Sequence, residues 1–298
     1  MLLLMSLTAT AVSCGGQDRS KESASSGSQS ASGGSSSNAG SASSASEATS
    51  ETDIQSTPEL EAAVGEYKAY VVEQTEQLVR DTSLFTSAVI AGNVEEAKEL
   101  YAPARVPWER IEPIAESLGD LDPNIDAREG DVPEDEWRGF HRLEQALWID
   151  NTTEGQEDYA HQLQADVETL QEEVSELQLE PADLVTGSIE LLNEVSAGKI
   201  TGEEERYSGT DLYDIQANVE GSQAAFEALQ PMLEERDPDL VAEIDERFDA
   251  VYETLAPYRD GDGWVPYTDV TEDERRQISQ SIDALAEPLS QIGQALQT

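Results

Sequence analysis

The chain has 298 residues, of which 38% are hydrophobic and 6% aromatic, which is enough for one large folded domain or two smaller ones. Its 63 acidic residues outnumber its 17 basic residues and give a formal net charge of −46. Nucleic acid is excluded as a natural partner, because phosphate binding requires clustered Lys and Arg that this chain lacks. A dense acidic surface is typical of a salty or extracellular setting and identifies no site by itself.

The first residues resemble the signal sequence of a bacterial lipoprotein. An apolar run over residues 2–12 is too short to span a bilayer as a helix, and Ser13-Cys14-Gly15 follows it. We therefore expect residues 1–13 to be a signal peptide and Cys14 to be the lipidated first residue. Cys14 is the only cysteine, so a disulfide within the chain and a thiolate metal cluster are both excluded. No Lys or Arg precedes the apolar run, so translation could start upstream of Met1.

Residues 14–56 are almost wholly Ser, Gly, Ala, Thr and acid, without apolar periodicity. This composition predicts a flexible tether that holds a folded domain away from a membrane.

The folded part, residues 57–298, has helical period throughout. Thr57-Pro58-Glu59 predicts its start, because it supplies a capping residue, a proline at the first helical position and an early acid. No stretch alternates strictly, so a sheet is not expected. The fold class is therefore all-α, with two antiparallel helical bundles side by side. The pattern predicts helices at about 58–91, 94–102, 105–118, 133–150, 154–178, 181–197, 210–236, 238–258 and 271–297.

One predicted helix carries a histidine and a carboxylate on its apolar face. Trp137, His141, Glu144 and Trp148 recur at steps of four, three and four, which places their side chains in one stripe. A buried carboxylate must meet a cation, a hydrogen-bond donor or a metal, or keep its proton. The pattern alone leaves two interpretations open: a core Glu satisfied by other side chains beside an interior His, or a metal site.

Other acidic segments have structural interpretations. Glu109, Glu112 and Glu116 share one line on a predicted helix, which is typical of a solvated face. The loop 120–129 offers oxygen ligands but lacks the pattern of a calcium-binding hand. The segment 201–204 has the spacing of a capping box for a following helix.

Several motifs, in order, resemble the imelysin-like domain of the EfeO/EfeM family, from about residue 66 to the C-terminus. The motifs are Tyr101-Ala102-Pro103-Ala104-Arg105, Glu109 to Glu116, Asp120 to Glu129, Gly139-Phe140-His141-Arg142-Leu143-Glu144, Asp150 to Thr153, Gly202 to Ser208, and Tyr213 to Ser222.

The resemblance implies a bilobal, all-helical extracytoplasmic protein, anchored to the bacterial membrane by lipid, that binds iron for an EfeUOB-type uptake system. Its partners would be a membrane iron permease and a haem peroxidase, and it would not be an enzyme. The family's H-x-x-E motif falls on His141 and Glu144. The acids that the resemblance adds as ligands are Glu109, Glu112, Asp126 and Glu204, with Glu203 as an alternative to Glu204.

Two departures from the family pattern are visible. The tether stands where EfeO proteins commonly carry a cupredoxin-like domain, so the chain resembles the shorter EfeM-like form. Gly209 also stands where the family usually has a histidine, which puts any contribution of that histidine to metal binding in doubt.

The ligand chemistry suits Fe²⁺ or Fe³⁺, with Zn²⁺ or Mn²⁺ as alternatives, because it combines one imidazole with several carboxylates and no sulfur. We expect binding to weaken as the pH falls, since protons compete for the same lone pairs.

Two rival functions remain. Imelysin-like domains have been grouped with peptidases because of H-x-x-E, but a familiar zinc peptidase places two histidines one turn apart. This chain has only His141 and His161, which lie far apart in sequence. A lipoprotein that binds an acidic polysaccharide through a bridging cation is the other alternative.

Overall fold

A computed structural model describes residues 57–297. The predicted signal peptide, the lipidation site Cys14 and the predicted tether therefore lie outside the described residues.

The prediction of an all-α protein is confirmed. The longer helices are α1 (Pro58–Ile90), α2 (Val94–Glu109), α6 (Glu157–Glu176), α7 (Pro181–Ala197), α8 (Asp211–Arg236), α9 (Pro238–Leu255) and α10 (Glu272–Leu289). The shorter ones are α3 (Glu112–Ala115), α4 (Leu121–Asp126), α5 (Phe140–Gln145) and α11 (Ile292–Ala295). Single 3₁₀ turns lie at Glu116–Leu118, Lys199–Thr201, Ala256–Tyr258 and Tyr267–Asp269, and α5 continues as a π-helical turn, Ala146–Asp150. A two-residue antiparallel hairpin, β1 (Arg259–Asp260) and β2 (Gly263–Trp264), is the one strand pair among residues 57–297.

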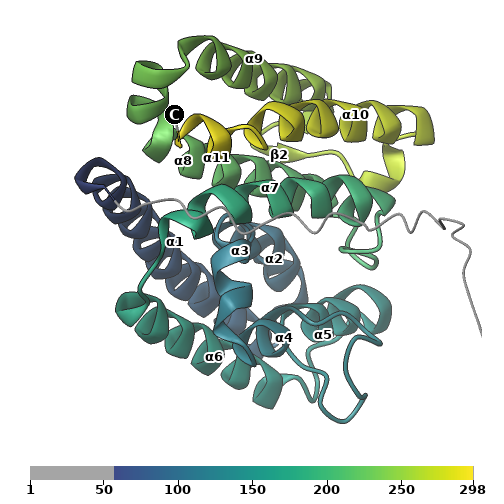
Figure 1. Cartoon of the computed structure of the whole chain (residues 1–298). Coiled ribbons are helices and arrows are strands. Elements are labelled where there is room, and N and C mark those ends of the chain that lie inside the picture. The colour runs from purple at the N-terminus through teal and green to yellow at the C-terminus, as the bar shows by residue number, and fades with distance from the viewer. Residues whose placement is uncertain (1–56, 298) are drawn as a thin grey trace, which may run out of the picture. The chain divides into compact units, whose positions relative to one another are not determined.

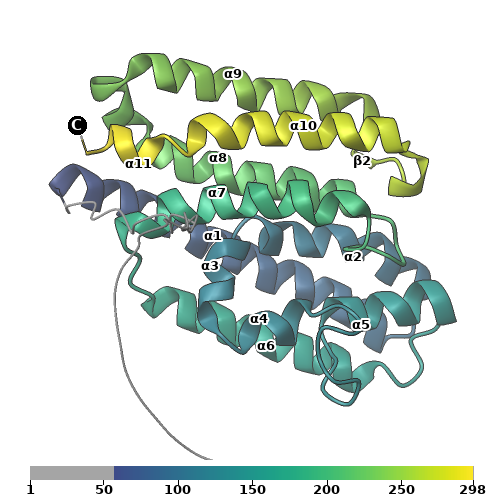
Figure 2. The same ribbon diagram turned by 45° about the vertical axis from the view of Figure 1, so that its right-hand side comes forward.

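The long helices form two groups that pack against each other. In Figures 1 and 2, α1, α2 and α6 lie on one side with α4 and α5, while α7, α8, α9 and α10 lie on the other. Helix α8 contacts α1 and α2 as well as α7 and α9, and so joins the groups. Their buried apolar side chains form one continuous core. Among the described residues, no helix combines the length and apolar character that crossing a membrane requires.

Caps at the helix starts follow the sequence signals. The Thr57 hydroxyl accepts a hydrogen bond from the Leu60 amide at 3.2 Å, which places the start of α1 where the sequence predicts it. Helix α10 begins with a full capping box, because Thr271 and Glu274 each bond the backbone of the other.

Three local predictions are wrong. Helix α2 runs through Pro103 and Pro107 to Glu109, although the sequence predicted a break at Pro103. The helix predicted from residue 133 starts only at Phe140. The short hairpin was not expected. Tertiary packing overrides local propensity in α2, since Tyr101 and Trp108 on either side of the prolines are fully buried.

Two glycines allow backbones to approach closely. A Cβ atom at Gly139 would overlap the carbonyl of Ile125 at the end of α4, and Gly139 has φ +91°. A Cβ atom at Gly221 in α8 would overlap the carbonyl of Arg110, which caps α2. The first contact holds the start of α5 against the end of α4, and the second holds α8 against α2.

Candidate metal centre

Helix α2 lines one side of a buried polar cluster. Tyr101, Arg105 and Glu109 are spaced by four residues and therefore share a face, and all three side chains are buried. The Arg105 guanidinium forms ion pairs with Glu109 and with Asp126 from α4, and its Nε lies 2.6 Å from an oxygen of Glu205. Arg105 thus holds carboxylates from three parts of the chain.

Helices α4 and α5 bring Asp126 and His141 together. Asp126 is the last residue of α4, and His141 lies in the first turn of α5, directly after the close contact at Gly139. His141 is 1% exposed and Glu144, one turn later, is fully buried. The predicted stripe that contains His141 and Glu144 is therefore buried, although its first residue, Trp137, lies before the start of α5.

One nitrogen of His141 is held by Glu144. The Nδ1 atom lies 3.1 Å from Oε2 of Glu144, while Oε1 of Glu144 accepts hydrogen bonds from the backbone amides of Tyr207 at 3.0 Å and Ser208 at 2.7 Å. Both oxygens of this carboxylate therefore have partners. Such an arrangement fixes the ring and assigns the Nδ1 proton to the carboxylate side, which leaves Nε2 for another task.

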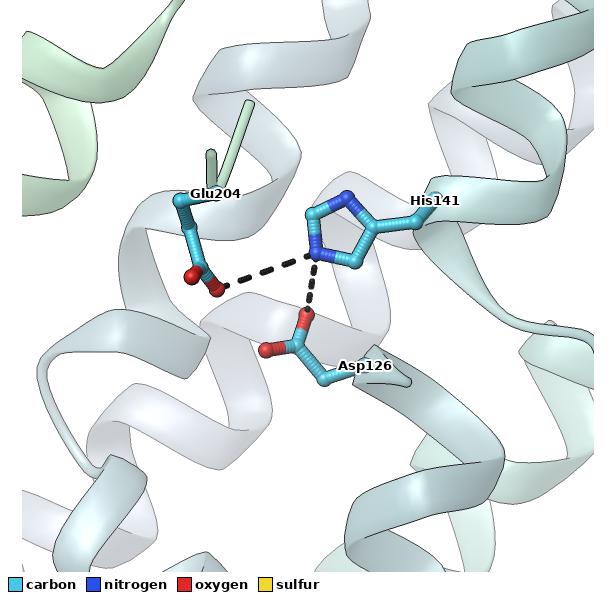
Figure 3. Close-up of side chains that lie close together, drawn as sticks. All are labelled: Asp126, His141 and Glu204. Carbon is cyan, nitrogen blue, oxygen red and sulfur yellow. Dashed lines mark ion pairs between the residues drawn. The ribbon is translucent and has the colours of Figure 1, made fainter. Parts of the chain in front are cut away.

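The other nitrogen of His141 faces two further carboxylates. Nε2 lies 3.5 Å from Oδ1 of Asp126 and 3.9 Å from Oε1 of Glu204, and Figure 3 shows both carboxylates directed at it. It is buried and makes no hydrogen bond within residues 57–297. The ligand atoms of Asp126, His141 and Glu204 lie within 4.8 Å of one another, close enough to bind one ion. A buried ring nitrogen that faces two carboxylates without a hydrogen bond is suited to a site where a metal replaces the proton.

The surroundings control the charge of these groups. Burial and Arg105 lower the pKa of His141, but the hydrogen bond to Glu144 and the charges of Asp126 and Glu205 outweigh them and raise it to about 9. Burial raises the pKa of Glu144, and the bond to His141 outweighs this and lowers it. The metal-free ring is therefore an imidazolium, and a metal at Nε2 would replace a proton.

A second group lies on the Nδ1 side. His141, Glu144 and Glu205 also offer ligand atoms within 4.8 Å of one another. There, however, Tyr101 donates to Glu205 at 3.2 Å and Ser208 donates at 2.8 Å. Burial, followed by repulsion from Glu144, raises the pKa of Glu205 to about 8. These bonds already satisfy the group, so the Nε2 side is the better cation site.

Lys199 neutralises two acids beside the centre. Its Nζ lies 2.7 Å from Glu109 and 2.6 Å from Glu112, and the lysine is 1% exposed. The Asn218 amide also donates to both carboxylates, at 3.0 and 3.1 Å. Burial raises the pKa of Glu109, but Lys199 and Arg105 outweigh this and lower it.

A pocket is lined by Asp126 and Glu204, the two carboxylates that face Nε2. It has a volume of about 230 Å³. Its lining residues include Glu112, Asp122, Asp126, Asp131 and Glu204, with Arg128 as the one basic residue lining it. An acidic pocket of this kind raises the local concentration of cations.

The structure separates the six residues that the sequence assigned to the metal. Asp126 and Glu204 face Nε2 of His141, and Glu144 lies at the other ring nitrogen, Nδ1. Glu109 and Glu112, from the acidic line on the predicted helix, point to Lys199 instead, and Glu109 is fully buried rather than solvated.

Sequence reasoning missed the roles of two buried cations, Arg105 and Lys199, and of the buried carboxylate Glu205. The spacing of Tyr101, Arg105 and Glu109 signalled a polar face on α2, but Lys199 carries no local signal because it lies between helices. The capping box at residues 201–204 is wrong, since a 3₁₀ turn ends at Thr201 and α8 begins only at Asp211.

The second histidine is remote from this centre. His161 is exposed on α6 and belongs to neither of the groups of potential ligands. The paired histidines of a familiar zinc peptidase are therefore not assembled in the described part of the chain.

The fold and the site define a class: an all-α protein with a buried centre of one histidine and several carboxylates at the junction of its helices. The chain belongs to the imelysin family (peptidase family M75), whose family model matches residues 63–292.

Similar proteins include the iron uptake system component EfeO of Escherichia coli (strain K12), of Shigella flexneri and of Shigella sonnei. Each is 50% identical to this chain over 237 residues. The match covers 78% of this chain and 63% of each relative, so the chain spans less than two thirds of their length.

Proposed function

We propose that this protein is the extracytoplasmic iron-binding component of an EfeUOB-type iron uptake system. The observation that carries the proposal is the buried Nε2 of His141, which makes no hydrogen bond and faces Asp126 and Glu204, two carboxylates that also line an acidic pocket. The similarity to EfeO over 78% of the chain supports iron as the cargo.

In this proposal His141, Asp126 and Glu204 bind the iron directly. One imidazole nitrogen and carboxylate oxygens suit Fe²⁺, and the surplus of hard oxygen ligands also suits Fe³⁺. Glu144 acts through the ring: it holds His141 so that Nε2 points at the ion, as carboxylates do in many metal sites.

Glu109 and Glu112 have a supporting role in this proposal. Both are neutralised by Lys199, so either could bind iron only after the ammonium group moved away. We propose that they hold Lys199 and Asn218 in place, and thereby fix the charge behind the Nε2 site.

The resemblance and the relatives named as iron uptake components support a proposal for the partners and the location. We propose that iron passes from this site to a membrane permease, with a haem peroxidase as the third component. A lipid at Cys14 would anchor the protein to the cell membrane, and the segment to residue 56 would let the folded part reach its partners.

The experiment is an anaerobic Fe²⁺ titration by calorimetry, with circular dichroism to establish that each variant is folded. We expect His141→Ala or Glu144→Ala to lower the affinity at least about tenfold, the typical loss when a ligand or its supporting carboxylate is removed. His161→Ala is the matched control, because it removes the only other histidine and leaves the centre intact.

Unchanged affinity in both His141→Ala and Glu144→Ala would sink the site assignment. Failure of the wild-type protein to bind iron would remove the function itself. Chelator-sensitive cleavage of peptides would favour the peptidase alternative, since a carrier binds metal and cleaves nothing.

A further inference from the structure

Arg128 lies beside two carboxylates of the candidate centre, Asp126 and Glu204. It follows α4 by two residues and lines the acidic pocket. Its Nη1 donates to Oε2 of Glu204 at 2.9 Å, while its Nε and its backbone amide both donate to Oδ2 of Asp131 at 3.1 Å. The side chain of Arg128 is 36% exposed and that of Glu204 is 5% exposed, so the guanidinium links the surface to the buried carboxylate.

This ion pair competes directly with a metal at the site. Glu204 is one of the two carboxylates that face Nε2 of His141, and its other oxygen is already held by Arg128. A guanidinium keeps its charge at every physiological pH, so Arg128 competes with a metal for Glu204 over that whole pH range. An ion that binds Glu204 must outcompete Arg128 or accept repulsion from it.

Besides His141, three cations lie near Glu204, and Arg128 is the one whose side chain is partly exposed to solvent. Arg105 and Lys199 lie 4.0 and 3.9 Å from its Oε1, but their side chains are 0% and 1% exposed and each binds further buried carboxylates. Moving either one would leave those acids unpaired in the interior, at a high cost. Arg128 has solvent beside it and Asp131 as a second partner.

We infer that Arg128 is an exchangeable counter-cation that closes the pocket in the metal-free protein and swings toward solvent when a divalent cation reaches Glu204. This inference rests on the proposed function, because it assumes a metal at the Nε2 side of His141. It adds a gate to the entry path: the arginine balances the charge of Glu204 until the ion replaces it.

The test compares Arg128→Gln with Arg138→Gln. The control removes the same charge from a side chain of similar exposure, 31%, whose ion pair with Asp166 lies outside the acidic pocket. The probe is Mn²⁺, which avoids oxidation, followed in stopped flow and calorimetry with the full chain. We expect Arg128→Gln to raise the association rate and the affinity about two- to fivefold above Arg138→Gln, the range for loss of one partly exposed ion pair.

Arg128→Lys and chemical modification provide independent readouts. Lysine keeps the charge, so we expect its association rate to stay near that of the wild type. Phenylglyoxal, which modifies accessible guanidinium groups, should label Arg128 faster in the Mn²⁺-loaded wild-type protein than in the metal-free one, as measured by peptide mass spectrometry.

The outcomes separate the two claims. Wild-type protein that takes up neither Mn²⁺ nor Fe²⁺ overturns the proposed function. Wild-type protein that binds metal, while Arg128→Gln binds no faster or more weakly than Arg138→Gln, overturns the gate and leaves the function standing. Equal labelling of Arg128 with and without metal also contradicts the gate.

Discussion

His141 lies between two kinds of carboxylate, and its two nitrogens have different surroundings. Nδ1 meets Glu144, whose other oxygen is fixed by two backbone amides, whereas Nε2 faces Asp126 and Glu204 without a hydrogen bond. In the proposed site, the H-x-x-E spacing would supply one ligand, His141, and the group that orients it, Glu144.

Glu144→Gln tests this division of roles. The glutamine oxygen would stay with the amides of Tyr207 and Ser208, so its NH₂ group would face Nδ1 and make that nitrogen an acceptor. The ring would then carry its proton on Nε2, the wrong tautomer for binding. We expect iron affinity to fall at least about tenfold, and ¹⁵N NMR of the metal-free variant to show protonated Nε2 and unprotonated Nδ1.

The matched control is Glu203→Gln, which makes the same change in charge at an exposed residue of the same connection. It should bind iron as the wild type does. Wild-type affinity in Glu144→Gln, with the Nδ1 proton retained, would contradict the role given to Glu144.

Sequence alone indicated part of this chemistry. The stripe through His141 and Glu144 predicted a buried carboxylate, and the structure buries both residues. Periodicity could not show which ring nitrogen Glu144 meets, because that depends on the backbone of residues 207 and 208. Nor could it show Lys199, which reaches Glu109 from a connection 90 residues later in the chain.

At the scale of elements, the start of α5 sets the distance between Asp126 and His141. Gly139 has a positive φ and packs so closely against the last turn of α4 that a Cβ atom would overlap the backbone there. After α5 the chain widens into a π-helical turn, a rare feature that is frequent at functional sites. The helix carrying H-x-x-E is thus short and irregular at both ends.

Gly139→Ala should disturb both stability and binding. The backbone conformation of Gly139, φ +91° and ψ −163°, costs about 1–3 kcal/mol for a residue with a Cβ atom, and overlap with the Ile125 carbonyl adds to it. We expect the free energy of unfolding, from urea titration, to fall by more than about 2 kcal/mol. Iron affinity should fall too, because relief of the overlap moves His141 away from Asp126.

Gly155→Ala is the control for the cost of placing a residue with a Cβ atom at a positive φ. Gly155 also has a positive φ, +79°, but an added Cβ atom would meet nothing within 4 Å. It should lose only the smaller, conformational part of the stability and keep its iron affinity. Equal losses in the two variants would show that the contact between α4 and α5 does not position the centre.

The elements themselves were predictable to different degrees. Caps at Thr57 and Thr271 mark helix starts because their hydroxyls act locally. The course of α2 through Pro103 was not predictable, because burial of the side chains around the proline keeps the helix intact. The late start of α5 depends on the contact between Gly139 and Ile125, which the local sequence does not reveal.

At the scale of the whole molecule, the surplus of acid has two separate roles. Many acidic residues of the described range 57–297 are exposed, whereas a few line the pocket or lie in the interior. Several of the buried ones, Glu109, Glu112 and Glu205 among them, pair with Arg105 or Lys199, which are buried as well. Composition could indicate an acidic protein, but only the packing of the two helix groups shows which acids face a histidine.

The central claim is that iron binds at Nε2 of His141 together with Asp126 and Glu204. The most direct measurement is a crystal structure of the iron-soaked protein with anomalous scattering recorded on both sides of the iron edge. The account predicts one anomalous peak in contact with these three side chains, with Glu144 still bonded to Nδ1. A peak on the Nδ1 side between Glu144 and Glu205, or iron bound elsewhere on the acidic surface, would contradict it.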